Sequence, residues 1–537
     1  MSALLVTLGH NSSAIAVDDI DGVATIICGY EEERLSGIKS DSHFPEQAIT
    51  KCLAQIHPDK AYVTHWSTDG SLDNMSRKHW QAERLDGMKI ISLSRGFTHH
   101  DSHAYAAACF AGPSFPTENS WVMVIDGFGN FGEHLSIYHH TKSGPKLKTR
   151  YYGYGTSLGL MYQYATAYLG LKMHEDEYKL LGYEVHADKI TREVLMIEAE
   201  GIADKMLHKM KTVMVDAFDP LIRLDALPAV QKHWIDIFDK IGKKYNLPHP
   251  HSTEGRAAYA FLIQSILECC VIMTTMKIDP DNLIVSGGVF YNVRLNYWLN
   301  GLVPGKFCVY PLAGDQGNAI GLYAKHNPSF VFPDNMNWGH RNLASEKDLF
   351  KDIPGLYVVD TDDEALTIMN VALLDIGYVN LVRGSMEFGP RALCNTSTIS
   401  LPHMSCVERI NHANGRNTVM PMAPVMTRGL YDEIFLAGNK VHKSEKYMVV
   451  SLDYKPEYGP RLSGAAHLYP DGSYTGRPQV IDEDPLMESL IRDHGVLINT
   501  SFNIHGSPIV YGMKEVIQSH CSQIEVDNSF ITVVVRN

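Results

Sequence analysis

The stretch LLVTLGHNSSAIAV, residues 4–17, decides the fold. Its apolar run Leu4–Leu8 predicts a buried strand, and the polar residues 9–13 that follow predict a turn. Ala14–Val17 and, after an Asp-rich turn, Ala24–Cys28 predict two further strands. A strand, a polar turn and two more strands indicate the start of an α/β domain that carries polar side chains at the end of its first strand.

This order of elements is typical of a ribonuclease-H-like domain, in which polar turns hold nucleotide phosphates. Two later apolar runs also lead into glycine-rich turns. Trp121–Ile125 precedes Asp126-Gly127, and Leu283–Val285 precedes Ser286-Gly287-Gly288. Apolar stretches at 158–169 and 257–276 have the length of helices. The sequence shows no repeat at a fixed period.

A second domain is expected after the segment Asn327–Asn342, which holds two prolines and several asparagines and is the predicted linker. Glu364–Ile376 predicts a helix beyond it, and Gly459–Ser473 predicts a surface loop. We therefore predict two α/β domains, residues 1–335 and 345–537.

The composition limits the class of protein. The chain has 537 residues, 45% hydrophobic, with 47 basic against 61 acidic side chains and a formal charge of −14. An acidic chain does not favour a general nucleic-acid coat, although a local basic groove stays open. The start lacks a basic n-region, no membrane span is expected, and nine scattered cysteines form no C-x-x-C pair. We expect a cytoplasmic protein with reduced thiols and no membrane partner.

Histidines at positions 99 and 103 could share a metal ion, because residues four apart lie on one face of a helix. The alternative is a polar helix with two unrelated histidines. Asp126 follows a predicted strand, and Asp315 lies in a glycine-rich turn, although either alone could be a turn former. Two histidines with one or two aspartates suit Fe²⁺, Mn²⁺ or Zn²⁺.

Other stretches could hold an anion or line a polar pocket. Ser286–Val289, with Asn292 soon after, lets backbone N–H groups approach a phosphate, or is a plain tight turn. Arg391 follows Gly389-Pro390 and could bind phosphate or form a surface salt bridge. The strand end 497–503 could line a pocket or cap its own turn. His10 could be a general base or a structural histidine.

Taken together, the segments resemble one family: the carbamoyltransferases of nodulation, cephalosporin, aminoglycoside and ansamycin pathways. The resemblance runs in order through most of the chain. The matching stretches are Gly9–Ser13, Glu31–Arg34 with Phe44-Pro45, His99–His103, Asp126-Gly127, Ser157–Gly159, Glu177–Gly182, Ser286–Val289, Glu387–Leu393, Ala423-Pro424 and Asn499–Asn503.

The resemblance implies an N-terminal Kae-type domain, which is an actin-like pair of ribonuclease-H-like lobes, and a C-terminal YrdC-like α/β domain. It places an Fe²⁺ ion, or another divalent transition metal, at His99, His103, Asp126 and Asp315. The positions implied for the nucleotide and the donor are Lys179, Gly287, Gly288, Asn292, Arg383, Arg416, Asn499, Ser501 and Asn503.

The resemblance also implies a reaction in two stages. Carbamoyl phosphate and ATP, with Mg²⁺, would form carbamoyl adenylate in the C-terminal domain. An acceptor hydroxyl would then take the carbamoyl group in the N-terminal domain. Arg391 would neutralise phosphate charge, and His10 would accept the hydroxyl proton.

The chain departs from the family at three basic positions of the C-terminal part. Thr396 and Met420 stand where relatives carry a basic residue, and His505 stands where an arginine is common. These changes put the phosphate contacts of the adenylation site in doubt. Arg383 and Arg416 are the candidates to compensate.

Two other functions stay open: a threonylcarbamoyl transferase acting on tRNA, and a non-catalytic ATP-binding scaffold with a decayed C-terminal site. The acceptor is also open. Small molecules and sugars fit, and so does a hydroxymethylated pyrimidine, free or in DNA. We expect the acceptor pocket between Lys189 and His251, in what reads as amphipathic helix. The sequence does not set the oligomeric state.

Overall fold

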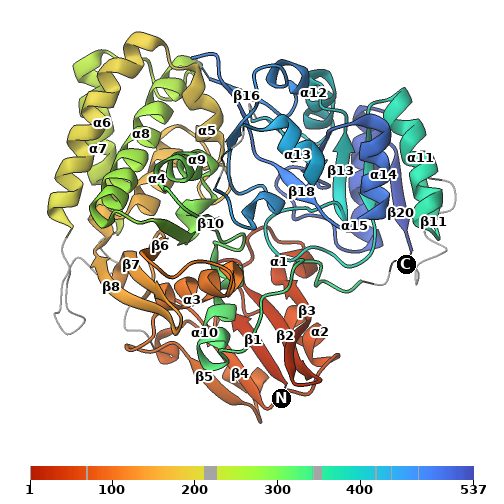
Figure 1. Ribbon diagram of the computed structural model, residues 1–537, viewed down its shortest axis with the longest axis horizontal. Helices are drawn as coiled ribbons and strands as arrows, with labels where there is room; N and C mark the ends of the chain where they lie inside the picture. The colour runs from red at the N-terminus through yellow and green to blue at the C-terminus, as the bar shows by residue number, and fades with distance from the viewer. Residues whose placement is uncertain are drawn as a thin grey trace.

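The computed structural model describes residues 2–67, 71–210, 227–341, 343, 353–417, 420–436, 438, 440–469 and 471–536. In these residues the chain forms three large sheets and one small one. Two sheets belong to the part before residue 327, and the third belongs to the part after 355 (Figure 1).

The first sheet has the order β3-β2-β1-β4-β5. Strands β1, β2 and β3 are antiparallel neighbours, whereas β4 and β5 continue parallel to β1. The short helix α1 follows β3, and α2 packs on β2 and β3. The elements are β1 (Ala3–Thr7), β2 (Ser13–Ile20), β3 (Val23–Glu31), α1 (Glu32–Ser36), α2 (Glu46–Leu53), β4 (Lys60–Thr64) and β5 (Lys89–Ser92).

The second sheet repeats this topology in the order β10-β9-β6-β7-β8. Strands β6, β7 and β8 are antiparallel, and β9 and β10 run parallel to β6. The same strand order in both sheets is that of a pair of ribonuclease-H-like lobes. The predicted actin-like, two-lobed N-terminal region is therefore confirmed. The strands are β6 (Ser120–Ile125), β7 (Glu133–Thr141), β8 (Gly144–Tyr152), β9 (Asn282–Ser286) and β10 (Phe307–Val309).

Two helices join the lobes by packing against each other. Helix α3 (His99–Ala111) follows the first sheet in the chain but covers the second sheet. Helix α10 (Asn318–His326) follows the second sheet but covers the first. Gly321 of α10 lies so close to α3 that a Cβ atom would meet the carbonyl oxygen of Ser102 at 1.7 Å. This close approach fixes α3, and with it both histidines, against both lobes.

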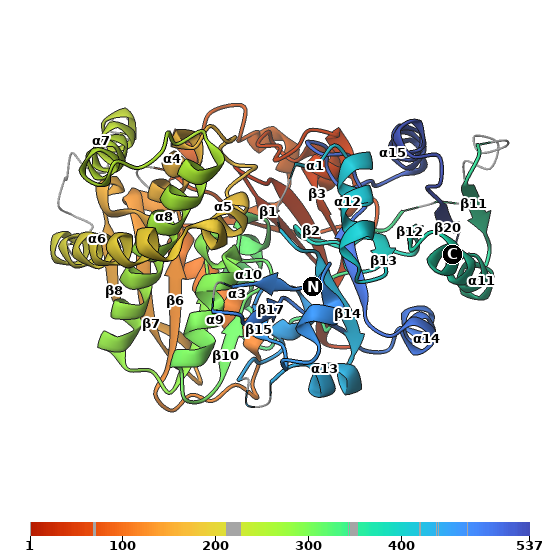
Figure 2. The same ribbon diagram turned by 90° about the horizontal axis from the view of Figure 1, so that it is seen from above.

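A helical layer is inserted into the second lobe between β8 and β9 (Figure 2). Its core helix α8 is 26 residues long and contains an 18-residue window with a mean hydropathy of 1.7, enough by length and composition alone to cross a membrane, which corrects the expectation that no apolar run reaches that length. Because 78% of its apolar window is buried in the protein, α8 is weak evidence for a membrane span. The inserted helices are α4 (Leu158–Tyr168), α5 (Lys179–Tyr183), α6 (Lys189–Lys209), α7 (Leu227–Tyr245) and α8 (Thr253–Ile278); α9 (Val293–Leu302) follows β9 and leads to β10.

The C-terminal part is an α/β unit around a seven-stranded sheet in the order β11-β20-β12-β13-β19-β14-β18. Its likeness to a YrdC fold stays a prediction, as do the domain limits 1–335 and 345–537. The strands are β11 (Leu356–Val359), β12 (Tyr378–Val382), β13 (Thr396–Ser400), β14 (Ala423–Thr427), β18 (Gln479–Ile481), β19 (Leu497–Ser501) and β20 (Thr532–Val535). The helices are α11 (Asp362–Asp375), α12 (Met404–Ala413), α13 (Arg428–Ile434), α14 (Pro485–His494) and α15 (Met513–Val526).

The C-terminal part packs closely on the second lobe. Val441 pairs with Phe307 of β10, and the Asn296 side chain of α9 donates to the Val449 carbonyl oxygen. The predicted loop 459–473 carries β16 (His467–Leu468), which pairs in a small sheet with β15 (Leu452–Asp453) and β17 (Tyr474–Gly476). That segment is therefore more ordered than a plain surface loop.

Candidate functional site

Helix α3 begins at a strongly held N-terminus. Thr98 and Asp101 form a capping box, in which the Thr98 N–H donates to the Asp101 carboxylate. The amide oxygen of Asn130 accepts from the His99 N–H, and the Glu133 carboxylate accepts from the His100 N–H. These bonds fix the first turn of α3 in a buried place, which aims the side chain of His99 in one direction.

The structure brings His99, His103, Asp126 and Asp315 into one cluster, with one ligand atom from each within 4.8 Å of the others. The Nε2 atoms of the two histidines are 3.1 Å apart. Asp315 Oδ1 lies 3.2 Å from His99 Nε2 and 3.4 Å from His103 Nε2. Asp126 Oδ2 lies 3.3 Å from His99 Nε2. The histidines are buried, and the aspartates are partly open.

Further polar groups hold these side chains in place from behind. The Asn318 amide nitrogen lies 3.2 Å from His99 Nδ1, and the Ser286 hydroxyl lies 3.4 Å from His103 Nδ1. The Gly127 N–H donates to the second oxygen of Asp126. Both Nε2 atoms therefore stay free to face the carboxylates. Two imidazoles and two carboxylates with oriented outer partners fit a divalent transition metal.

The charges in the cluster shift the pKa values of all four groups. Burial lowers the pKa of His99, but the carboxylates of Asp315 and Asp126 outweigh it and hold that pKa well above its usual value. Burial acts on His103 in the same way, and the aspartates raise its pKa too. Burial raises the pKa of Asp315, but the two histidines bring it down to about 2. The two carboxylates of the cluster are therefore stabilised by positive charge on the two histidines.

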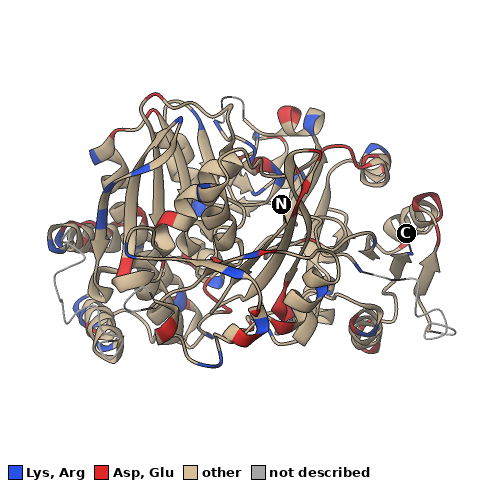
Figure 3. Ribbon diagram, turned by 90° about the horizontal axis from the view of Figure 1, so that it is seen from below, with Lys and Arg blue, Asp and Glu red and all other residues tan. Residues whose placement is uncertain are grey.

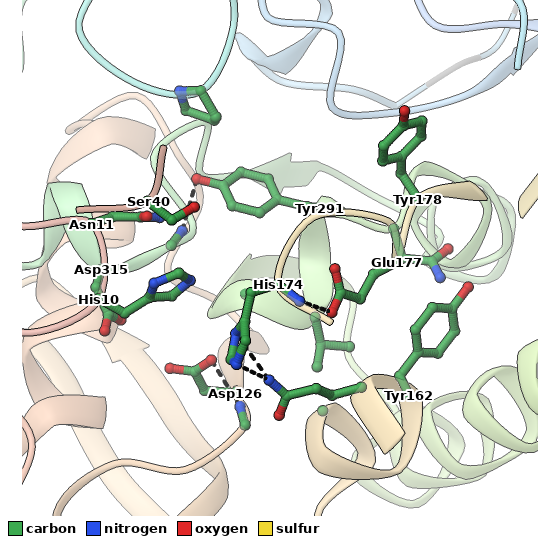
Figure 4. Close-up of a pocket in the computed structure, with 18 of the residues that line it drawn as sticks. His10, Asn11, Ser40, Asp126, Tyr162, His174, Glu177, Tyr178, Tyr291 and Asp315 are labelled. Atoms are coloured by element: carbon green, nitrogen blue, oxygen red, sulfur yellow. Dashed lines mark hydrogen bonds between the residues drawn. The ribbon is translucent and has the colours of Figure 1, made fainter. Parts of the chain in front are cut away.

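A cavity of about 560 Å³ opens onto this cluster (Figure 4). It joins the predicted base His10, both aspartates, the glycine turn and Arg391. Its further polar and aromatic lining includes Glu31, Glu33, Lys39, Trp66, Phe128, Tyr162, Gln163, His174, Glu175, Glu177, Tyr178, Tyr291 and Asn292. Residues that lie far apart in the sequence therefore meet around one space.

The glycine turn lies between the metal cluster and α9. Gly287 has φ +97°, and a Cβ atom there would lie 2.2 Å from the Ile125 carbonyl oxygen. Gly288 lines the cavity, and a Cβ atom on it would approach Asp126 Oδ1. Asn292 caps α9 by accepting from the Leu295 N–H. The turn thus brings bare backbone against the cavity at a helix N-terminus, an arrangement suited to an anion.

Arg391 lines the cavity, and among the described residues no carboxylate forms an ion pair with it. Its buried Nε has no hydrogen-bond partner, and burial lowers the pKa of its guanidinium. Arg477, which the sequence analysis did not select, lies near it, and burial lowers its pKa to about 9. Burial also lowers the pKa of Arg416 to about 10. The Tyr178 side chain lies near all three guanidiniums; Arg391 lines this cavity, and Arg477 lines a smaller pocket. The three positive charges suit an anion near Tyr178.

Arg416 binds the polar residues at the end of β19, which the sequence analysis selected as a candidate pocket lining. Its guanidinium donates to the Thr500 hydroxyl, to Ser501 and to the Asn503 side chain, all of which are neutral acceptors. Asn499 lies deeper and donates to the Ala392 carbonyl oxygen. The 497–503 stretch therefore supports the arginine cluster.

Arg383 and Lys179 do not line this cavity, and neither do Arg416 and Arg477, but the first two are also paired with carboxylates. Arg383 forms an ion pair with Asp484, and Lys179 Nζ lies 2.8 Å from Asp176 Oδ1. Their expected roles in binding the donor and nucleotide have no support from this geometry. Arg477, rather than Arg383, supplies a buried guanidinium beside Arg391.

Thr396, at the departure from the family pattern, receives a hydrogen bond from a different arginine. Arg341 donates to the Thr396 hydroxyl at 3.0 Å. Its other N–H groups go to backbone carbonyl oxygens of Gly384, Arg383, Asn395 and Tyr511. Since every donor of Arg341 is used, it anchors the segment before the third sheet and does not replace the lost phosphate-binding arginine.

His174 is a second residue that sequence reasoning missed. Its backbone has φ +67°, and its ring centroid lies 5.2 Å from that of His10 at the cavity mouth. Gln163 contacts the His174 ring, and the His174 N–H donates to Glu177 (Figure 4). No periodicity in the sequence marks this loop position. The expected acceptor region at 189–251 is helical in α6 and α7, and residues 211–226 lie outside the described residues.

Two family models match the chain. The model described as the carbamoyltransferase N-terminus matches residues 81–323, and that described as the carbamoyltransferase C-terminus matches residues 371–535. Between them they span most of the chain and include all four residues of the metal cluster.

Three relatives are similar at about the same level. An uncharacterized protein of Methanocaldococcus jannaschii is 26% identical, with 95% of each chain covered. The nodulation protein NolNO of Sinorhizobium fredii is 25% identical, over 95% of this chain and 76% of its own. The 3'-hydroxymethylcephem-O-carbamoyltransferase of Amycolatopsis lactamdurans is 26% identical, over 50% of this chain and 51% of its own.

Proposed function

The chain belongs to the carbamoyltransferase family, and from this premise we propose that it is an ATP-dependent O-carbamoyltransferase of a small-molecule acceptor. It would form carbamoyl adenylate from carbamoyl phosphate and ATP, and then pass the carbamoyl group to a hydroxyl. One observation carries the proposal: a single cavity joins a candidate base, the two aspartates of the metal cluster, a glycine turn and the buried Arg391.

The donor half of the reaction is assigned to the C-terminal part, as a YrdC-like unit. Carbamoyl phosphate gives up its phosphate to water, and a carbamate oxygen attacks the α-phosphorus of ATP. The new O–P bond forms as the bond to pyrophosphate breaks. Arg391, Arg416 and Arg477 would offset the charge of the phosphates, because their buried guanidiniums have no carboxylate partner in the described residues.

The transfer half is assigned to the cavity between the lobes. The acceptor oxygen bonds to the carbamoyl carbon, the bond from that carbon to the AMP oxygen breaks, and AMP leaves. His10 takes the hydroxyl proton. Gly288 and Asn292 would hold the nucleotide at the start of α9. A metal held by His99, His103, Asp126 and Asp315 would supply a Lewis acid.

The charge of the cavity favours an uncharged or cationic acceptor. Six carboxylates and two basic side chains line it. Basic and acidic residues are interspersed over the elements of the view in Figure 3. Phosphate contacts of a polynucleotide need clustered Lys and Arg, so a hydroxymethylated base within DNA is the second choice.

The test is ATP–pyrophosphate exchange with purified protein, with and without carbamoyl phosphate. Exchange that needs carbamoyl phosphate and is lost in Arg391→Ala supports the proposal. Arg492→Ala, at an exposed residue of α14, is the matched control and should exchange normally. Exchange that needs threonine and bicarbonate instead would favour the threonylcarbamoyl alternative. No exchange, with ATP bound, would favour the scaffold.

A further inference from the structure

The acidic stretch Glu31–Arg34 joins the first lobe to the turn that carries Arg391. Glu31 ends β3, and Arg34 lies in α1. Both side chains are buried, at 4% and 5% exposure. Neither side chain has a role in the reaction as proposed above.

These two side chains together bind both backbone polar atoms of Gly389. The Gly389 N–H donates to Glu31 Oε2 at 3.0 Å, and Arg34 Nη2 donates to the Gly389 carbonyl oxygen at 2.7 Å. Arg34 also donates to Glu31 Oε2 at 3.3 Å from both Nε and Nη2. The contact thus combines an ion pair with two hydrogen bonds to one glycine of the C-terminal part.

Gly389 cannot shift easily at this point. It has φ +108°, and a Cβ atom there would lie 2.4 Å from a Leu312 side-chain carbon. Pro390 follows and fixes its own φ, so the direction of the chain into Arg391 is set by where Gly389 is held. Leu312 lies three residues before the metal ligand Asp315, which ties the same turn to the metal cluster.

The far side of the turn is held by another carboxylate. Glu387 Oε1 accepts from the N–H groups of Leu393, Asn395 and Thr396. Arg391 thus projects from a loop held at both ends by buried carboxylates. Neither carboxylate forms an ion pair with the Arg391 guanidinium, so its charge remains available to the cavity.

A buried ion pair is seldom the most stable way to fill a space, because removing two charges from water costs more than their attraction returns. Its advantage is a defined geometry. We propose that Glu31 and Arg34 are positioning residues that hold the Arg391 guanidinium at the anion side of the cavity, and so make the donor site depend on the first lobe. This inference rests on the proposed function only for its kinetic readout.

A double-mutant cycle tests the proposal. Glu31→Gln and Arg34→Lys keep the size of each side chain but weaken the hold on Gly389. We expect each variant to raise the KM for carbamoyl phosphate in ATP–pyrophosphate exchange by about 10-fold or more, with a smaller change in kcat. In the Arg391→Ala background the same substitutions should add less than 2-fold, because their effect passes through Arg391.

Binding of inorganic pyrophosphate, measured by calorimetry, supplies a readout that does not need turnover. Both variants should weaken it in the presence of Arg391 and leave it unchanged in Arg391→Ala. Arg492→Lys is the matched control. Equal losses with and without Arg391 would overturn the inference, since they would show a general structural role. If wild type binds pyrophosphate in this Arg391-dependent way but does not exchange, the proposed function fails and the inference stands.

Discussion

Metal binding to the four-residue cluster should release protons, and its affinity should rise with pH. The metal-free cluster holds two carboxylates whose charges raise the pKa of both His99 and His103 above the usual value. The raised pKa values favour the protonated imidazoles, and a divalent ion must displace these protons, one or two in number, to bind. Each displaced proton makes the affinity about tenfold more favourable per pH unit, or about 1.4 kcal/mol. The apparent affinity should thus rise by about 10- to 100-fold between pH 6 and pH 7.

The same shifts set the sign of the stability change. The raised pKa of His99 contributes stability below pH 6.5, and this contribution is lost as the pH rises through the folded value. The lowered pKa of Asp315 contributes stability above pH 3.8, and this is lost as the pH falls through about 2. The metal-free cluster is therefore most stabilising between about pH 4 and pH 6.5. The stabilisation by added metal should increase above that window.

Calorimetric titration with Mn²⁺ in two buffers of different ionisation enthalpy measures both the affinity and the number of protons released. His103→Gln removes one ligand and should lower both. His139→Gln, on β7 beside Trp121, is a control that should leave both unchanged. An affinity that is equal at pH 6 and pH 7, with no proton released, would refute the assignment of these residues as a metal site.

Three further outcomes follow from the same geometry. Gly287→Ala should lower the free energy of unfolding, measured in urea, by roughly 2–4 kcal/mol, because both the positive φ and the Ile125 oxygen at 2.2 Å oppose a Cβ atom. Gly301→Ala is the control: it lies in open space on α9, so it should raise the free energy of unfolding by about 0.5–1 kcal/mol. Asn318→Ala should weaken Mn²⁺ binding by about 10- to 100-fold in calorimetry, since it removes the partner of His99 Nδ1, and an unchanged affinity would contradict that role. Arg477→Ala should weaken pyrophosphate binding by about 10- to 100-fold, because a hydrogen-bonded charge is lost, and wild-type affinity would exclude Arg477 from the anion site.

Local pattern and the family resemblance selected the four residues that the structure brings together as the candidate metal cluster. The spacing of His99 and His103 fixed a shared helix face, and Asp126 followed a recognisable strand. The partners of isolated arginines were not readable, because they depend on distant segments. Arg383 is paired with Asp484, about a hundred residues later, whereas Arg477 enters from the short connection between β17 and β18.

The two lobes were predicted through the family resemblance and not from a repeat in the sequence, for a physical reason. Both sheets need the same strand order but not the same side chains, since any apolar residues of suitable shape can fill each core. The helices α4–α8, inserted between β8 and β9, also remove any fixed spacing between the copies. The first strands could be predicted because they alternate with polar turns. The repeat, in contrast, lies only in the order in which the strands pair within each sheet.

This duplicated topology accounts for where the chemistry lies. In each lobe the first strand ends in a polar turn: β1 leads to His10, and β6 leads to Asp126. The exchanged packing of α3 and α10 holds the two lobes together, so both strand ends lie at one cavity and His99 lies against Asp126. The C-terminal part then adds Arg391 at the same cavity, held through Gly389 by the first lobe. A shift of either lobe would therefore move the candidate base, the metal ligands and the anion-binding arginine relative to one another, so catalysis should depend on lobe closure as much as on any single side chain.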